Sequence, residues 1–254
     1  MKKLKYMLWG LCLLATTPFF TSCLDDKEDL TYGISSEMQL STVRLLDNDK
    51  LYFEFDDGNT LYPNDGSVLR NYDAQDGQRV FVYYNLLEEK VEGYTYHGDI
   101  RLIQDILTKQ IIPLTEETED SIGDDRINVV EMLIAGGYLN LSFQYYGTHT
   151  EDNKHMLNLV QNETIEYPES DYIPLEFRHN AYDDYPSCIG WGYVCFNLES
   201  IEELIEEKKG LEIRIRTIND GIIYERIDFK KNSRSAWNSS MHIESSVNSS
   251  HTIK

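Results

Sequence analysis

Apolar and polar residues alternate along most of this chain between residues 38 and 231. A period of two places successive side chains on opposite faces, so it predicts β-strands with one face buried and the other solvated. In the clearest run, 138–146, the apolar positions Leu139, Leu141, Phe143 and Tyr145 alternate with Asn140, Ser142 and Gln144. The 18 tyrosines of the chain also favour strands. We therefore expect an all-β protein.

The first group of predicted strands falls in residues 38–114. Strand-like runs bounded by Asp, Asn and Gly lie at 40–46, 51–55, 79–87 and 94–103. A long excursion rich in Pro, Gly and Asn occupies residues 63–77, and we expect a short helix or turn at 104–109. Short strands with one long excursion are typical of a small barrel, and an OB-like barrel is among the candidates.

A second group occupies residues 126–231, after an acidic linker at 115–125. Its strand-like runs lie at 127–135, 138–146, 154–161, 171–178, 192–198, 211–218 and 222–229. Two turns, Gly136-Gly137 and Asn219-Asp220-Gly221, favour hairpins between neighbouring runs. So many short strands in about 100 residues predict a β-sandwich.

One short helix interrupts this second group. Ser200 and Glu203 have the spacing of a capping box, and Gly210 is suited to ending a helix in the left-handed conformation. Lys208 and Lys209 would lie in its last turn, where cations interact favourably with the helix dipole. We therefore expect a helix that begins after Ser200 and ends before Gly210.

The start of the chain has the layout of an export signal in residues 1–22. Three lysines precede a mostly apolar stretch, Leu8 to Phe20, which is shorter than the roughly 20 residues that a membrane span requires. The sequence Phe-Thr-Ser-Cys that ends at Cys23 resembles a bacterial lipobox, which makes Cys23 the expected site of lipid attachment. The alternative is a plain secretory signal with an unrelated cysteine.

The residues after Cys23 are acidic and form an expected tether at 23–37. One interpretation is a solvated spacer that holds the folded part away from the bilayer. The other is that the acidic run resembles the surface-export signal of Bacteroidetes lipoproteins. We expect an outer-membrane lipoprotein exposed at the cell surface, with a periplasm-facing protein as the alternative.

The charge of the chain limits its partners. Its formal net charge is -21, and removal of the three lysines in the export signal makes it about -24. Nucleic-acid binding depends on Lys and Arg that neutralise phosphates, so we expect no nucleic-acid partner. The last segment, 232–254, is rich in Ser and Asn, and we predict a disordered tail there.

Motifs of known chemistry are missing from the sequence. It contains no G-x-S-x-G, H-E-x-x-H or P-loop pattern, so we expect neither an enzyme nor a cofactor. Four potential metal ligands fall within seven residues, but we interpret this segment as a polar turn: His149, Glu151, Asp152 and His155. The acidic runs near Asp47 and Asp56 lack the spacing of a calcium loop and read as turns. We predict no metal site.

Two cysteines besides Cys23 remain in the exported chain, Cys188 and Cys195. A disulfide is possible between them only if Gly190, Trp191 and Gly192 turn the chain back on itself. The alternative is that Cys195 is a small apolar residue within a strand.

Aromatic residues are the remaining candidates for recognition. Most of the tyrosines are expected in cores and strand faces. The segment 180–186 is the exception, because it reads as a loop that carries Tyr182 and Tyr185 beside two aspartates.

Several ordered motifs resemble the NigD-like lipoproteins of Bacteroidetes. They include the segments 77–80, 107–109, 120–141 and 154–160. The resemblance implies an N-terminal OB-like domain and a C-terminal β-sandwich. It associates the family with a bacteriocin-type locus without supplying a molecular activity.

Asp120-Ser121-Ile122 also fits the acceptor pattern of Bacteroides O-glycosylation, which makes Ser121 a candidate modification site.

Three functions follow as hypotheses. The first is a lipid-anchored, non-enzymatic module that binds a protein or glycan partner. The second is an immunity or envelope-protection protein that neutralises a bacteriocin-like toxin. The third is a hydrolase with an unrecognised site.

Overall fold

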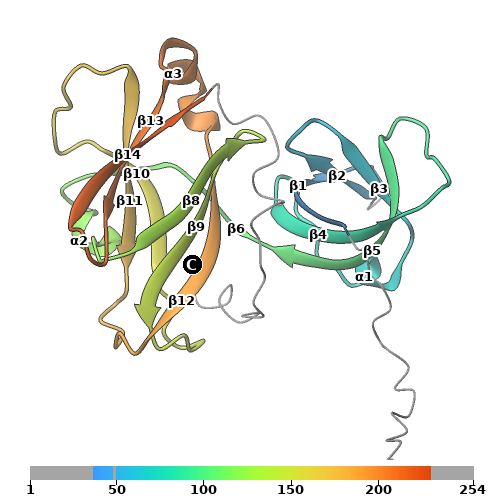
Figure 1. Ribbon diagram of the computed structural model, residues 1–254, viewed down its shortest axis with the longest axis horizontal. Coiled ribbons are helices and arrows are strands. Elements are labelled where there is room, and N and C mark those ends of the chain that lie inside the picture. The colour runs from blue at the N-terminus through green and yellow to red at the C-terminus, as the bar shows by residue number, and fades with distance from the viewer. Residues whose placement is uncertain (1–36, 48–49, 230–254) are drawn as a thin grey trace, which may run out of the picture. The chain divides into compact units, whose positions relative to one another are not determined.

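A computed structural model describes residues 37–47 and 50–229 (Figure 1). The export signal 1–22, Cys23, nearly all of the tether 23–37 and the tail 232–254 lie outside the described residues. The described residues belong to one compact unit. They form a closed barrel and a two-layered sandwich, so the all-β prediction is confirmed. Within these residues, no helix is long and apolar enough to cross a bilayer.

The barrel contains strands β1 to β5 in the closed order β1-β2-β3-β5-β4. Its elements are β1 (Glu37–Leu45), β2 (Leu51–Phe55), β3 (Thr60–Pro63), α1 (Ser67–Arg70), β4 (Arg79–Leu86) and β5 (Tyr96–Asp105). Alternate residues of the strands point inward and fill the barrel with Val43, Phe53, Phe55, Leu61, Val80, Val82, Tyr84 and Ile100. The alternation seen in the sequence therefore places the apolar face inside the barrel, as expected for an OB-like fold.

The sandwich consists of two packed sheets, which Figure 1 shows as separate layers. One sheet has the order β14-β13-β11-β10-β7 and the other has the order β6-β12-β9-β8. The strands are β6 (Leu107–Gln110), β7 (Ile112–Leu114), β8 (Asn128–Ala135), β9 (Tyr138–Gly147), β10 (Met156–Asn162), β11 (Tyr172–Asn180), β12 (Cys188–Asn197), β13 (Gly210–Arg216) and β14 (Ile222–Asp228). Both predicted hairpins are confirmed, with Gly136, Gly137 and Gly221 at positive φ in their turns.

The boundary between the two parts lies earlier than expected. β6 pairs in parallel with β12, and β7 pairs in parallel with β10, so both strands belong to the sandwich rather than to the segment 38–114. The predicted helix or turn at 104–109 is therefore wrong. Only one residue separates β6 from β7, and the two strands enter opposite sheets, so this short connection ties the layers of the sandwich together.

The expected single helix also differs in detail. The described residues contain three short α-helices, of which α2 (Glu119–Ile122) lies in the predicted linker. α3 spans only Glu202–Glu207, after a 3₁₀ turn η1 (Glu199–Ile201), and its N-terminus has no side-chain cap. Gly210 begins β13 instead of ending the helix. Gly210 pairs with both β11 and β14. The close approach of β14 requires a glycine here, because an added Cβ would lie 2.1 Å from the backbone oxygen of Ile227.

A fully buried arginine joins the barrel to the sandwich. The Arg79 guanidinium on β4 donates to both carboxylate oxygens of Asp56 at 2.7 and 2.9 Å, and to the Thr42 hydroxyl at 2.8 Å. It also lies 3.3 Å from Asn140 Oδ1 and stacks 4.8 Å from the Tyr138 ring, both in the sandwich. Burial opposes the positive charge, but the hydrogen bonds and charge of Asp56 raise the pKa of Arg79.

Apolar side chains surround this arginine and seal the junction. Barrel residues Leu40, Phe81 and Ile106 cluster with sandwich residues Leu133, Tyr138 and Cys195. The ring of Phe81 meets that of Tyr193 edge-on at 5.3 Å. The Arg79 side chain is fully buried at this junction, whereas the Asp56 side chain remains 16% exposed.

The Arg79→Ala substitution tests how much the buried ion pair contributes to the free energy of unfolding. It leaves the Asp56 carboxylate without its cation in a buried setting, so we expect the free energy of unfolding to fall by about 3 to 5 kcal/mol. Arg101→Ala is the matched control, because Arg101 is 49% exposed and pairs with Asp99 at the surface. It should cost less than about 1 kcal/mol in the same urea titration. Equal losses in the two variants would contradict a structural role for the buried pair.

Candidate functional site

Three polar rings meet at one end of the sandwich core. Tyr145 on β9 comes from one sheet, while His155 before β10 and His179 on β11 come from the other. Each continues the apolar face of its strand, and their exposed fractions are 0%, 1% and 1%. The Tyr145 ring lies 4.9 Å from that of His155 and 6.0 Å from that of His179. These three rings form the end of the sandwich core that lies next to the loops.

The two histidines belong to a chain of hydrogen-bond contacts. His155 Nε2 lies 3.1 Å from Asp184 Oδ2, and His155 Nδ1 lies 2.9 Å from His179 Nε2. His179 Nδ1 in turn lies 3.1 Å from the backbone oxygen of Arg126. The chain therefore links the loop after β11 to the segment before β8 through the interior.

Asp184 anchors this chain to the loop after β9. Its carboxylate accepts from the Thr148 backbone N–H at 2.6 Å, from the Thr148 hydroxyl at 2.8 Å and from Asn153 Nδ2 at 3.0 Å. The side chain is only 3% exposed. Burial alone would raise its pKa, but the Thr148 and His155 hydrogen bonds lower the pKa of Asp184 to about 2. One buried carboxylate thus holds two loops together.

The environment of His179 disfavours a charge on its ring. Burial, together with the positive charge of His155, lowers the pKa of His179 to about 4. The hydrogen bond to the Arg126 carbonyl and the charge of Asp125 act in the opposite direction and are weaker.

The backbone around these contacts is unusual. His149, Tyr182 and Asp183 have positive φ values of 54°, 49° and 60°. Such conformations cost energy for residues other than glycine and persist only where the surroundings fix them. Gly190 makes room for the His149 ring, because a Cβ there would lie 2.2 Å from His149 Cε1. The loops are therefore held in one defined shape.

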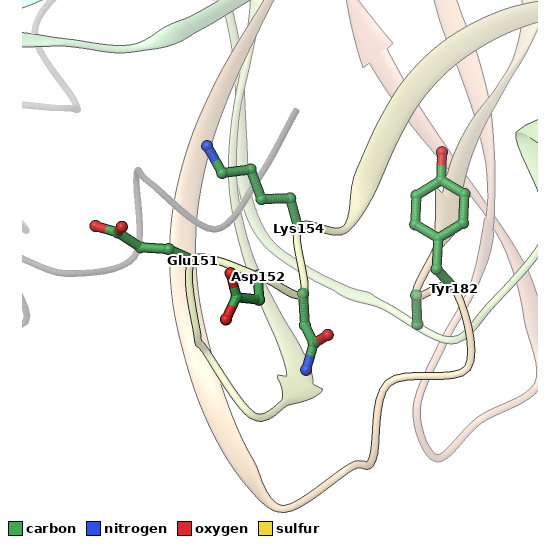
Figure 2. A pocket seen from close by; sticks show the side chains of 6 residues that line it. Glu151, Asp152, Lys154 and Tyr182 are labelled. Atoms are coloured by element: carbon green, nitrogen blue, oxygen red, sulfur yellow. The ribbon is translucent and has the colours of Figure 1, made fainter.

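A shallow cavity of about 280 Å³ opens between these loops. Figure 2 shows Tyr182 on one side of it and Asp152 and Lys154 on the other. The remaining lining residues are Glu151, Asn153 and Ala181. Its lining is polar and charged, apart from the Tyr182 ring and Ala181.

Five large aromatic or aliphatic residues are exposed on the loop after β11 and at the adjoining ends of β9 and β12. Tyr182 and Tyr185 on the loop after β11 are 48% and 73% exposed. Tyr146 on β9 and Ile189 on β12 are direct cross-strand partners, and Trp191 lies two residues further along β12. Their exposed fractions are 42%, 45% and 44%. We call these five residues the loop-end surface.

The structure separates the four potential metal ligands of the segment 149–155. His155 points into the core, while Glu151 and Asp152 line the cavity and His149 Nε2 lies 3.0 Å from the Cys188 backbone oxygen. Within residues 37–47 and 50–229, no group of three or more His, Cys, Asp or Glu is placed to hold a metal ion. Asp56 belongs to the Arg79 junction and not to a calcium loop.

The possible disulfide between Cys188 and Cys195 does not form. Both residues lie on β12, which pairs with β9 without interruption from Cys188 to Asn197, and both thiols are free. Seven residues of extended strand span roughly 23 Å, far more than a disulfide allows. The three residues expected to turn the chain are strand residues instead. Cys195 is buried, and burial raises its pKa to about 11.

Ser121 lies on the short helix α2 and is exposed. Its hydroxyl donates to the Thr118 carbonyl at 2.9 Å. Its glycosylation stays a prediction, as does lipid attachment at Cys23, which lies outside the described residues.

The sequence analysis singled out the loop 180–186 but placed His155 in a polar turn and missed His179. The interpretation of His155 is wrong, because its ring is buried in the core beside Tyr145. One signal was present, because His179 is in phase with Ile173, Leu175 and Phe177 on the buried face of its strand. A polar ring at such a position needs a partner in the core. Nothing in the sequence indicates that the partner is His155.

The geometry argues against hydrolytic chemistry at this chain of contacts. A carboxylate next to a histidine can orient a general base, but the base must reach a substrate proton. One ring nitrogen of His155 faces Asp184 and the other faces His179. Neither nitrogen is open to a substrate, so the arrangement holds loops rather than reacting.

The barrel order and the two-sheet sandwich define a two-part protein in which an OB barrel precedes a β-sandwich. The description "NigD-like N-terminal OB domain" matches residues 40–106, and "NigD-like C-terminal beta sandwich domain" matches residues 110–230. The chain belongs to the NigD-like family. No functionally curated protein matches it.

Three solved structures from Bacteroides and Parabacteroides species are similar to this chain. A protein provisionally described as toxin-related, from Parabacteroides distasonis, is 30% identical, with a TM-score of 0.63 and coverage of 77% of this chain and 93% of that one. A protein of unknown function from Bacteroides vulgatus is 25% identical, with a TM-score of 0.67 and coverage of 77% and 91%. A NigD-like immunity protein from Bacteroides caccae is 20% identical, with a TM-score of 0.56 and coverage of 75% and 92%, and supports the fold alone.

Acid sensitivity tests the role of Asp184. Its pKa is lower in the folded protein than the ordinary 3.8, so its contribution to stability is present above about pH 4 and is lost as pH falls towards 2. We expect the folded protein to lose up to about 2 kcal/mol of stability from this group over that range. Asp184→Asn should be less stable at neutral pH and lack this component. Asp183→Asn, in the exposed neighbour, should retain it in urea titrations at each pH.

Proposed function

We propose that this chain is a lipid-anchored envelope protein that binds a protein partner through its loop-end surface and catalyses no reaction. The observation that carries the proposal is the exposure of three tyrosines, a tryptophan and an isoleucine on loops and strand ends that a buried network holds in place. Large aromatic side chains contribute strongly to protein interfaces when a rigid surface presents them.

Rigidity matters to this proposal because binding orders side chains and loops at a free-energy cost. The Asp184 contacts to Thr148 and Asn153 fix the two loops before any partner arrives. The ring stacking and hydrogen bonding of His155 and His179 fix them to the core. The loop-end surface is therefore preorganised, which reduces the cost of association.

The anchor follows from the start of the sequence. Cys23 ends a lipobox-like run, and several acyl chains on one cysteine would hold the protein at a membrane where a single chain would not. The acidic residues after Cys23 favour placement on the outer face of the outer membrane. A glycan is the alternative class of partner.

The second candidate is an immunity or envelope-protection protein. It is favoured by the names of two relatives, one called an immunity protein and one described as toxin-related. Immunity by neutralisation also requires a protein interface, so the loop-end surface serves this candidate as well. The identity of the bound partner separates the two functions.

Site-directed crosslinking tests the surface. A photoreactive phenylalanine analogue at Tyr185, introduced in living cells, should give a discrete adduct with one identified protein. The matched control is Tyr224 on β14, which is 61% exposed outside the loop-end surface. Identical adducts at both positions would count against a specific interface.

The identified partner then allows a quantitative check. Tyr185→Ala and Trp191→Ala should each weaken its binding about tenfold or more, as expected for aromatic residues at an interface centre. Tyr224→Ala should leave the dissociation constant unchanged. Calorimetry with the purified proteins gives the comparison, and equal effects of all three variants would reject the assigned surface.

Replacement of the anchor cysteine tests the location. Cys23→Ser should move the protein from the membrane fraction to the soluble fraction, because no acyl chain can then be attached. Protease treatment of intact cells should degrade the native lipoprotein if it faces outward. Survival until the outer membrane is broken would instead indicate a periplasm-facing protein.

A further inference from the structure

The contacts of His155 and His179 set a requirement on the number of protons that the two rings carry. His155 Nε2 faces the Asp184 carboxylate at 3.1 Å, and His179 Nδ1 faces the Arg126 carbonyl at 3.1 Å. Both oxygens are acceptors, so each of these nitrogens must carry a hydrogen. Two neutral imidazoles have only two hydrogens, and these outer contacts use both.

The inner contact between the rings then has no hydrogen to share. His155 Nδ1 and His179 Nε2 would present lone pairs to each other across 2.9 Å. One further proton turns this repulsion into a hydrogen bond, whereas two would place two N–H groups against each other. We propose that His155 and His179 share one additional proton, so that the pair forms a singly charged proton-binding site beside Asp184.

The groups around the pair fit a single positive charge. The Asp184 carboxylate comes from the loop after β11, and Asp125 acts on His179 from the segment before β8. From the facing sheet, Tyr145 contributes a ring edge, and the His149 ring packs against Tyr145 at 4.8 Å. A second positive charge is resisted, since burial and the charge of His155 lower the pKa of His179 to about 4.

This site controls the two loops because Asp184 holds both. The proton bridges His155 to His179 on β11, and His155 bonds the carboxylate that binds Thr148 and Asn153. Loss of the shared proton brings the lone pairs into opposition and favours release of the loops from the core. The inference goes beyond the proposed function and stands whether or not the loop-end surface binds a partner.

A metal ion is the main competing occupant of the inner position. Histidine ligands commonly donate their outer N–H to a carboxylate or a carbonyl, as these two do. Zinc in proteins takes about four ligands, however, and only two ring nitrogens face inward here. In the part of the chain that the structure describes, no third His, Cys, Asp or Glu joins them in a metal-holding group. A shared proton therefore accounts for the geometry better than a metal ion does. The experiments below include one result that would instead reveal a bound metal.

Nitrogen NMR on the mature lipoprotein in detergent, labelled at histidine, tests the shared proton directly. At mildly acidic pH we expect one proton coupled to both His155 Nδ1 and His179 Nε2. On raising the pH, both rings should change in a single one-proton step. The hydrogen-exchange protection factor of the Thr148 amide should fall in the same step, by at most about tenfold per pH unit.

Two glutamine substitutions supply the comparison. His179→Gln places an amide N–H where it can donate to His155 Nδ1 without an extra proton. The hydrogen-exchange protection factor of the Thr148 amide should therefore no longer fall in a one-proton step as the pH rises. His97→Gln changes a barrel histidine whose Nδ1 lies 2.9 Å from the Glu89 carbonyl, and it should leave the step unchanged. If His179→Gln does not fold, the wild-type coupling and titration decide the question.

Three results would overturn the proposal. They are independent titration of the two rings, a Thr148 step that persists in folded His179→Gln, and a metal ion that native mass spectrometry finds bound in wild type and missing in His179→Gln.

Discussion

The buried Arg79–Asp56 pair is the interaction on which the relation between the barrel and the sandwich depends. Removing two charges from water is costly, and good geometry with further hydrogen bonds is needed to offset that cost. The bidentate contact to Asp56, the Thr42 hydroxyl and the approach of Asn140 supply those bonds. Because their partners come from both parts, the two terminal guanidinium nitrogens make all of these contacts only when barrel and sandwich meet.

The need of buried polar groups for hydrogen-bond partners also shapes the end of the sandwich where the core meets the loops. There the core ends in polar rings instead of apolar side chains, and His155 and His179 need partners because they are removed from water. Asp184 supplies one partner and thereby holds the loop that carries Tyr182 and Tyr185 against the loop after β9. These two exposed tyrosines are thus held in place by buried polar contacts, which give their loop a defined shape.

Strand positions were predictable because alternation reports directly which face of a strand is buried. The hairpins at Gly136-Gly137 and at Gly221 were predictable for a related reason, since their turns need positive φ. The assignments of 104–109 and of Gly210 failed because both depend on distant partners. β6 exists through its pairing with β12, and Gly210 pairs with β11 and β14. Of the site, the loop 180–186 was visible in the sequence, whereas His155 was expected in a polar turn and His179 was not recognised.

By itself the sequence determined the all-β class, the order of a barrel and a sandwich and the acidic net charge of the chain, and it predicts lipid attachment at Cys23. These properties follow from local periodicity, composition and short motifs. Only the tertiary structure decided that Arg79 is buried at the junction, that Cys188 and Cys195 lie too far apart to pair, and that His155 meets His179. Each of these depends on which strands become neighbours, a long-range choice that no short stretch of sequence contains.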